Sequence, residues 1–346
     1  MDPITQGVLG VTAAQLTATR QQKIAAAVLG FFSGMAADLD VLIRSSNDPL
    51  LYLEYHRHFT HSLIFIPFGA LVCALFFRWV FRTWFARDGL SFSRIYLFCF
   101  AGYASHALLD ACTTYGTQLF WPFSSTRFAW NNVSVIDPLF TLPLIAFITA
   151  AVWRRSSKLA VLASAYVVAY LSLGLLQNSR ALQAAEQLAS SRGHQPINLA
   201  VKPSFANLMV WKSVYEHAGS YYVDAVRVLA TPKVYPGGAT AKLNLSHHFD
   251  WLDLSSQQAE DVERFRWFSN DHLGIDPRNP QRIIDIRYSL VPNRFDGMWG
   301  ISLDKKASPL AHVSFNSVRP ESAEMDQSIA ELWQMIRGLE VLPRSK

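Results

Sequence analysis

A long apolar segment, residues 62–84, constrains the fold of this chain more than any other feature of its sequence. It reads SLIFIPFGALVCALFFRWVFRTW, and its only charged residues, Arg78 and Arg82, lie close to its end. About 20 apolar residues in a helix cross a hydrocarbon core about 30 Å thick, and arginines at the end of such a helix reach the interface with water. We therefore predict a transmembrane helix here.

Other apolar segments extend this prediction to the whole first half of the chain. Three of them follow the long segment and two shorter ones precede it: residues 95–112, 137–153, 159–177, 4–19 and 24–37. The two short ones are marginal in length, so they form either a short hairpin or a re-entrant segment. We expect a polytopic α-helical membrane domain at residues 1–178, with about five or six membrane helices.

The second half has the mixed composition of a soluble domain. Charged residues make up 16% of the chain, below the share of about 25% that is usual in soluble proteins, and the deficit lies in the first half. We expect a linker at 179–195 and a soluble β-rich or α+β domain at 196–346. Its expected strands are NLMVWKSVYE, SYYVDAVRVL and RIIDIRYSLV, with YPGGA and VPNRFDG as turns and SAEMDQSIAELWQMIRGL as a C-terminal amphipathic helix.

Basic residues predict the orientation of the membrane domain. They gather in three loops between apolar segments: Arg20 and Lys23; Arg78, Arg82, Arg87 and Arg94; Arg154, Arg155 and Lys158. By the positive-inside rule these loops are cytoplasmic. We therefore expect a protein of the bacterial inner (plasma) membrane with its C-terminal domain on the periplasmic, extracytoplasmic side. These loops also account for the net charge of +5, so we expect membrane lipid and no nucleic acid as a partner.

Ionisable residues near the ends of the apolar segments are the strongest functional signal. Under the predicted orientation they share the non-cytoplasmic surface: Asp2, Asp38, Asp40, His56, His58, His61, His106, Asp110 and Asp137. Unpaired ionisable groups cost free energy at membrane depth, so groups at the same level are expected to interact with one another. Imidazoles and carboxylates without a thiolate suit Zn²⁺, Mn²⁺ or Fe²⁺.

Two spacings within this set predict how its members face one another. His106 and Asp110 are four residues apart and therefore share one face of a helix, as two metal ligands or as a buried hydrogen-bonded pair. Asp38 and Asp40 are two residues apart, so only one of them is expected to face the interior. A solvated helix end is the alternative for this second pair.

The stretch HRHFTHS supplies three histidines and one arginine. His61 opens the long apolar segment, whereas His56 has to reach a site from a loop. His58 either shares a face with His61 or is exposed. Arg57 binds an anion or a lipid headgroup, or it is an arginine that extends to the interface.

Residues 113–137 are rich in aromatic side chains, which is typical of a membrane-interface belt. The functional alternative is a lip that admits an acyl chain, with Arg127 close to a phosphate. Asp137 precedes Pro138 at the start of an apolar segment. It either contacts the site or is the N-cap of a helix.

These motifs together resemble the YdjM family of bacterial inner-membrane proteins, which are described as metal-dependent hydrolases. The resemblance lies in MDPITQGVLG, GMAADLD, HRHFTHS, SHALLDACTTYGTQLFWPFS and IDPLFTLPL, and in NLMVWKSV, SYYVDAV, RFRWFS and IIDIRYSL of the second half. It implies the following metal ligands: Asp38 or Asp40, His56, His61, His106 and Asp110. A more distant similarity in ligand order to zinc-dependent phospholipase C implies a multi-zinc site on helices.

The chain departs from the family pattern at one position. The first motif of the family typically reads Thr-His, whereas this chain has Thr5 and Gln6. Glutamine is a poor ligand for a transition metal. We therefore expect one metal position to be weakened or lost, or to be filled by Asp2.

We thus expect a membrane-bound metal-dependent hydrolase that uses metal-activated water on a lipid or lipid-linked phosphoester at the outer interface. Its cofactor is one or more divalent ions, Zn²⁺ first. Asp38, Asp40 and Arg57 are the candidates for catalysis, either aspartate being a ligand or the general base. Further contacts to ligands or substrate are expected from Asp2, His58, Arg127 and Asp137. The alternatives are a non-catalytic membrane regulator or scaffold with a structural metal, and a transporter.

Overall fold

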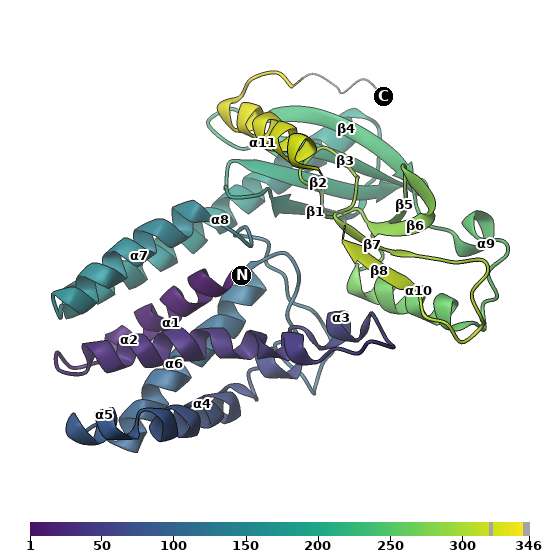
Figure 1. The fold of residues 1–346 in the computed structure, drawn as a ribbon. Helices are drawn as coiled ribbons and strands as arrows, with labels where there is room; N and C mark the ends of the chain where they lie inside the picture. Colours follow the sequence, from purple (N-terminus) through teal and green to yellow (C-terminus); the bar gives the residue numbers. More distant parts are fainter. Residues whose placement is uncertain (318–320, 342–346) are drawn as a thin grey trace. The chain divides into compact units, whose positions relative to one another are not determined.

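The computed structural model describes residues 1–317 and 321–341, which form two compact units (Figure 1). The first unit comprises residues 1–43, 55–175 and 205–207. The second unit comprises residues 44–54 and 176–204 and the described residues from 208 on. The division between 175 and 176 falls close to the boundary that composition predicts.

The first unit is helical. Its elements are α1 (Pro3–Thr17), α2 (Lys23–Met35), the 3₁₀ helices η1 (Ala36–Leu42) and η2 (Phe59–His61), α4 (Ile66–Val80), α5 (Arg82–Arg87), α6 (Phe92–Cys112), α7 (Pro138–Trp153) and the first part of α8 (Ser157–Ser191). Two of these helices begin with an aspartate cap followed by proline. Asp2 accepts a hydrogen bond from the Thr5 amide (3.0 Å), and Asp137 accepts one from the Leu139 amide (3.1 Å).

Among the described residues, three helices are long and apolar enough to cross a membrane: Lys23–Leu42, Phe92–Cys112 and Ser157–Ser191. A fourth span results if the bent pair Leu51–His61 and Ile66–Val80 is counted as one. The structure thus supports three or four spans, whereas five or six were expected. The reason is length, because α1 and α7 have 15 and 16 residues, or about 22–24 Å at 1.5 Å per residue.

The long apolar segment at 62–84 is not one straight helix. Pro67 lies in the first turn of α4, where a missing amide hydrogen costs nothing, and the helix begins at Ile66. It ends at Val80, and α5 starts after a break at Phe81. Hydropathy alone predicted the segment but not these two interruptions.

Glycines allow α1, α2 and α6 to pack closely. A Cβ atom on Gly30 would lie 2.5 Å from the Gly10 carbonyl oxygen, and one on Gly34 would lie 2.7 Å from the Gln6 carbonyl oxygen. Small residues at such positions let helix backbones approach each other in membranes. The approach brings the start of α1 and the end of α2 against the C-terminal half of α6.

The second unit contains two antiparallel four-stranded sheets, as the expected β-rich domain requires. The first has β1 (Ile197–Pro203), β2 (Val210–His217), β3 (Ser220–Arg227) and β4 (Lys233–Ala241) in chain order, and the second has β5 (Leu273–Asp276), β6 (Asn279–Asp285), β7 (Trp299–Ser302) and β8 (Ser314–Ser317) in chain order. The expected turn YPGGA lies inside β4, so that prediction was wrong. Gly237 is needed there because a Cβ would meet the Val223 carbonyl oxygen of β3 at 2.1 Å.

Helices complete the second unit: α3 (Leu51–Tyr55, its first four residues), the end of α8, α9 (Leu245–His248), α10 (Gln257–Phe268) and α11 (Ser322–Arg337). The predicted C-terminal amphipathic helix is α11, whose Leu332 and Met335 pack with Val210, Ala225 and Tyr235 of the first sheet. Residues 179–191 of the expected linker are helical, because α8 runs on to Ser191. Arg264 binds Asp48 at 2.8 Å and Glu54 at 2.5 Å, which holds residues 44–54 in this unit.

Candidate metal centre

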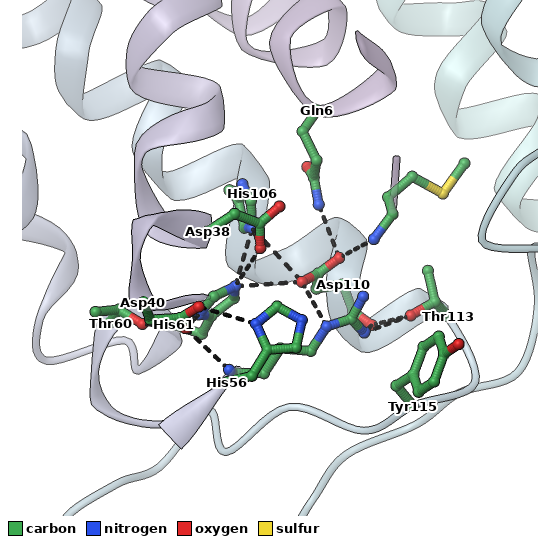
Figure 2. Close-up of polar contacts among 12 residues, drawn as sticks. Gln6, Asp38, Asp40, His56, Thr60, His61, His106, Asp110, Thr113 and Tyr115 are labelled. Atoms are coloured by element: carbon green, nitrogen blue, oxygen red, sulfur yellow. Dashed lines mark hydrogen bonds and ion pairs between the residues drawn. The ribbon is translucent and has the colours of Figure 1, made fainter. Parts of the chain in front are cut away.

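Four side chains from three elements converge in the first unit (Figure 2). Asp38 comes from η1, His61 from η2, and His106 and Asp110 from one face of α6. The Nε2 atoms of His61 and His106 are 2.9 Å apart. Asp38 Oδ1 lies 3.4 and 3.3 Å from these two nitrogens, and Asp110 Oδ2 lies 3.3 and 3.5 Å from them.

The arrangement of hydrogens on the two imidazoles favours a cation between them. His106 Nδ1 lies 2.6 Å from the Gly34 carbonyl oxygen, so this nitrogen donates a hydrogen. His61 Nδ1 faces Asp40 Oδ2 at 3.2 Å and donates likewise. In neutral rings both Nε2 lone pairs then point at each other, and only a proton or a metal ion between them removes the repulsion.

The distances fit a metal ion. A tetrahedral Zn²⁺ ion with bonds of about 2.0–2.1 Å separates its ligand atoms by about 3.3–3.4 Å, and four of the five distances above lie close to this value. Asp110 Oδ2 is buried, and its one cationic partner with a permanent charge is Arg57 among the described residues. The four residues therefore have the ligand types and the spacing that a divalent transition metal requires.

Asp40 is not one of the four residues of this cluster, but it forms hydrogen bonds with residues around it. Its Oδ2 accepts hydrogen bonds from the Arg57 amide (3.0 Å) and the Thr60 hydroxyl (2.8 Å) in addition to His61. Its Oδ1 lies 2.8 Å from His56 Nδ1. Metal-bound histidines usually give their other nitrogen to such a carboxylate, which fixes the orientation of the ring. The sequence predicted one inward aspartate, but both point inward, on opposite nitrogens of His61.

Asp110 is also held by polar groups from two further segments, the N-terminal residues and the turn at Arg57. Its Oδ1 accepts a hydrogen bond from Gln6 Nε2 (2.8 Å) and lies 2.5 Å from the Met1 amino group. Arg57 Nε lies 3.0 Å from Asp110 Oδ2. The Arg57 side chain is buried, bonds to the Thr113 hydroxyl (2.8 Å) and lies over the Tyr115 ring. Gln6 thus contacts a ligand residue, although it is not itself part of the cluster.

His56 belongs to a second, looser group that shares Asp38 with the first. Asp38, Asp40 and His56 each offer a ligand atom within 4.8 Å of the others. The side chains of Asp38 and His56 are 20% and 23% exposed, whereas those of His61, His106 and Asp110 are inaccessible. Solvent and any substrate therefore reach the cluster from the side of Asp38 and His56.

The remaining candidates lie outside both groups. Asp2 caps α1, and Asp137 caps α7 and accepts a hydrogen bond from the Tyr170 hydroxyl (2.8 Å). The His58 ring packs beside Trp121. Arg127 donates to the Gly116 carbonyl oxygen (3.1 Å), within its own loop.

Sequence patterns did not predict the Gly34 carbonyl or the roles of Thr113 and Tyr115. A main-chain acceptor leaves no pattern of side chains in the sequence. The contact of Gly34 with His106 can therefore be found only when the packing of α2 on α6 is known. Arg57 has a φ of +64°, an unusual backbone for a residue with a side chain. This turn sends the arginine inward toward Asp110 while its amide bonds to Asp40.

Comparison with known proteins places the chain in a family. The profile of the YdjM inner membrane protein family matches residues 1–181, which is more than half of the 346 residues. The chain belongs to the YdjM family. All residues of the cluster and of its Asp40 support lie inside the matched region.

Two relatives show how far the similarity extends. An uncharacterized protein, YfhP of Bacillus subtilis (strain 168), is 22% identical over 265 residues, which cover 73% of this chain and 74% of YfhP. The inner membrane protein YbcI of Escherichia coli (strain K12) is 37% identical over 110 residues, 31% of this chain and 60% of YbcI. No solved structure matches the chain. The similarity to zinc-dependent phospholipase C therefore stays an expectation from ligand order alone.

Proposed function

We propose that this YdjM-family protein is a membrane-bound hydrolase that uses a divalent transition metal, Zn²⁺ first and Mn²⁺ or Fe²⁺ as alternatives, on a lipid or lipid-linked phosphoester. The observation that carries the proposal is the convergence of Asp38, His61, His106 and Asp110. When bound, the ion lowers the pKa of a water molecule and makes it a nucleophile at neutral pH. Placement in a membrane protein favours a substrate at headgroup depth.

The residues around the cluster have distinct roles in this proposal. Asp40 keeps a hydrogen on His61 Nδ1 and thereby leaves Nε2 for the ion. The same carboxylate orients His56, whose Nε2 can take up or release a proton on the accessible side. Arg57 is 3% exposed and paired with Asp110, so we assign it the positioning of a ligand rather than contact with substrate.

A second candidate function is a membrane regulator or scaffold with a structural metal. It is favoured by the number of ligands, because four protein ligands close a tetrahedral site, whereas catalytic zinc usually has three and an open position. The behaviour of Asp38 distinguishes the two functions. It is the accessible candidate ligand, and the site would be catalytic only if a water molecule can replace Asp38 on the ion.

The first experiment measures metal in the detergent-purified full chain by elemental analysis. We expect about one equivalent of metal per chain in the wild type and loss of it in both His61→Ala and His106→Gln. Asp40→Asn keeps the ligands but should weaken metal affinity about 10–100-fold. His58→Ala is the matched control and should retain the metal, because its ring packs on Trp121 outside the cluster.

The outcomes separate the proposals. Wild-type protein without metal after remetallation, or equal metal in all variants, would exclude a metal centre and with it both functions. Metal without turnover on phospholipids or lipid phosphates would favour the scaffold. Turnover that falls about 10²–10⁴-fold in His56→Gln at unchanged metal content would support the hydrolase with His56 in proton transfer.

A further inference from the structure

The first unit has a surface cavity of about 540 Å³ at the junction of α4 and α5. It lies at the C-terminal end of α4, whereas the metal centre includes η2, just before the N-terminal end of this helix. Fifteen residues of helix separate the two ends, or about 22 Å. In Figure 1 α5 continues from the far end of α4. The cavity is thus separate from the metal centre.

The polar part of the cavity is positively charged. Arg78 and Arg82, four residues apart across the break between the helices, both line it, as does Ser91. Neither arginine forms an ion pair with a carboxylate in the part of the chain that the structure describes. The nearby Asp88 is engaged by Arg87 and by the Trp84 indole (2.7 Å). Two guanidinium groups therefore meet at one cavity without a counter-charge.

The apolar part of the cavity continues into the exposed apolar side of α4. Leu75 and Trp79 line the cavity and are 54% and 73% exposed. They extend an exposed apolar stripe along the same helix, made of Phe68, Leu71, Val72 and Phe76. Phe85 and Leu90 form its buried wall. An occupant can therefore place an anionic group at the arginines and a hydrocarbon chain along α4.

We propose that this cavity binds the phosphate of an anionic phospholipid whose acyl chain lies along α4. Arginine is suited to phosphate because its planar donors bind two oxygens at once, and basic pockets between membrane helices hold lipid headgroups in this way. A free phosphate compound would satisfy the arginines but would leave the exposed apolar stripe unused. The inference does not depend on the metal centre.

The test is native mass spectrometry of the detergent-purified full chain titrated with palmitoyl-oleoyl phosphatidylglycerol. The zwitterionic phosphatidylethanolamine with the same chains and glycerol phosphate are the comparison probes. We expect the double variant Arg78→Gln/Arg82→Gln to bind phosphatidylglycerol about tenfold more weakly than the wild type. The matched control is Arg154→Gln/Arg155→Gln, a second basic pair at a helix end that does not line the cavity; it should bind like the wild type.

A second variant, Ala86→Trp, fills the cavity while both arginines remain, and Ala86 is exposed on α5. It should also lose phosphatidylglycerol, and melting curves check that each variant is folded. Equal binding by all variants, or by both phospholipids, would overturn the proposal, as would unchanged binding in Ala86→Trp. Competition by glycerol phosphate at equal concentration would assign the arginines to a free phosphate compound instead.

Discussion

At the scale of single residues, the buried environment of Lys212 in the second unit lowers the pKa of its side chain. It lies on β2 directly opposite Lys202 of β1, and both side chains are buried. Its ammonium group donates to the Ser289 hydroxyl (2.8 Å) and to the Arg294 carbonyl oxygen. Burial lowers the pKa of Lys212 to about 7, and it also lowers that of Lys202 well below its ordinary value.

This environment predicts how stability depends on pH. The folded pKa of Lys212 is about 7 and the unfolded one 10.5, so the unfolded chain binds more protons between these values. The free energy of unfolding should therefore rise with pH across this window, by up to about 1.4 kcal/mol per pH unit from this residue. Lys212→Met should remove that slope from melting curves of the full chain between about pH 7 and 9.

The control is Lys305→Met in the same unit, because Lys305 is exposed. It should keep the wild-type slope. Lys202 remains in all three proteins, so only the difference in slope between Lys212→Met and the wild type reports on Lys212. Identical slopes in all three would show that Lys212 stays charged in the folded state.

The metal centre shows which residue-level features a sequence can predict. The spacing of His106 and Asp110 put both on one helix face, because an α-helix repeats every 3.6 residues. The pairing of Asp38 and Asp40 with the two nitrogens of His61 was not predictable, since it depends on the tighter 3₁₀ turn of η1 and on the loop that returns at His56. The residue types indicated metal-binding chemistry, whereas the role of each aspartate depended on the path of the backbone around His61.

At the scale of elements, the close packing of α1, α2 and α6 positions the residues of the candidate metal centre. Gly34 is an example. Its carbonyl oxygen accepts a hydrogen bond from His106 Nδ1 (2.6 Å), and its lack of a side chain leaves room for the Gln6 backbone. One glycine thus sets both the distance between two helices and the orientation of one ligand.

We expect Gly34→Ala to lower metal affinity about tenfold or more, the effect usual for loss of a hydrogen-bond partner of a ligand. The new Cβ would be 2.7 Å from the Gln6 carbonyl oxygen, so α1 has to move and Asp110 loses its contact with Gln6. Metal titration of the purified full chain measures the effect. The neighbour Ser33→Ala serves as the control, since it removes a hydroxyl of α2 that bonds to the Leu29 carbonyl and to Cys99 of α6 but leaves Gly34 and the space beside Gln6 unchanged. Wild-type affinity in Gly34→Ala would mean that helix packing does not position His106.

Element boundaries were less predictable than element types. Apolar runs indicated the helices, and alternating patterns indicated a β-rich domain and three of its strands, β2, β3 and β6, since these patterns follow directly from which faces are buried. The predicted turn at YPGGA failed because Gly237 serves close approach to β3 rather than a reversal of the chain. Glycine marks a position where a side chain does not fit, and the sequence alone does not say what occupies that space.

At the scale of the whole molecule, charge and hydropathy divide the chain into an apolar first half and a second half with the composition of a soluble domain. Composition changes near residue 178, and the structure divides between residues 175 and 176. The number of spans did not follow from composition, because α1 and α7 are apolar but short, and hydropathy does not decide whether such helices cross the bilayer or are covered by their neighbours.

Orientation is the whole-molecule property that, under the proposed function, would decide which substrates can reach the candidate metal centre. The three basic loops predict that Arg87 and Lys158 are cytoplasmic and that the second unit is extracytoplasmic. In intact cells, a membrane-impermeant maleimide should therefore label Lys305→Cys of the second unit but should label Arg87→Cys only after permeabilisation. The natural cysteines, Cys73, Cys99 and Cys112, are buried and give a low background. The reverse pattern would place the second unit in the cytoplasm, and the substrates of the proposed hydrolase would then have to come from the cytoplasmic leaflet.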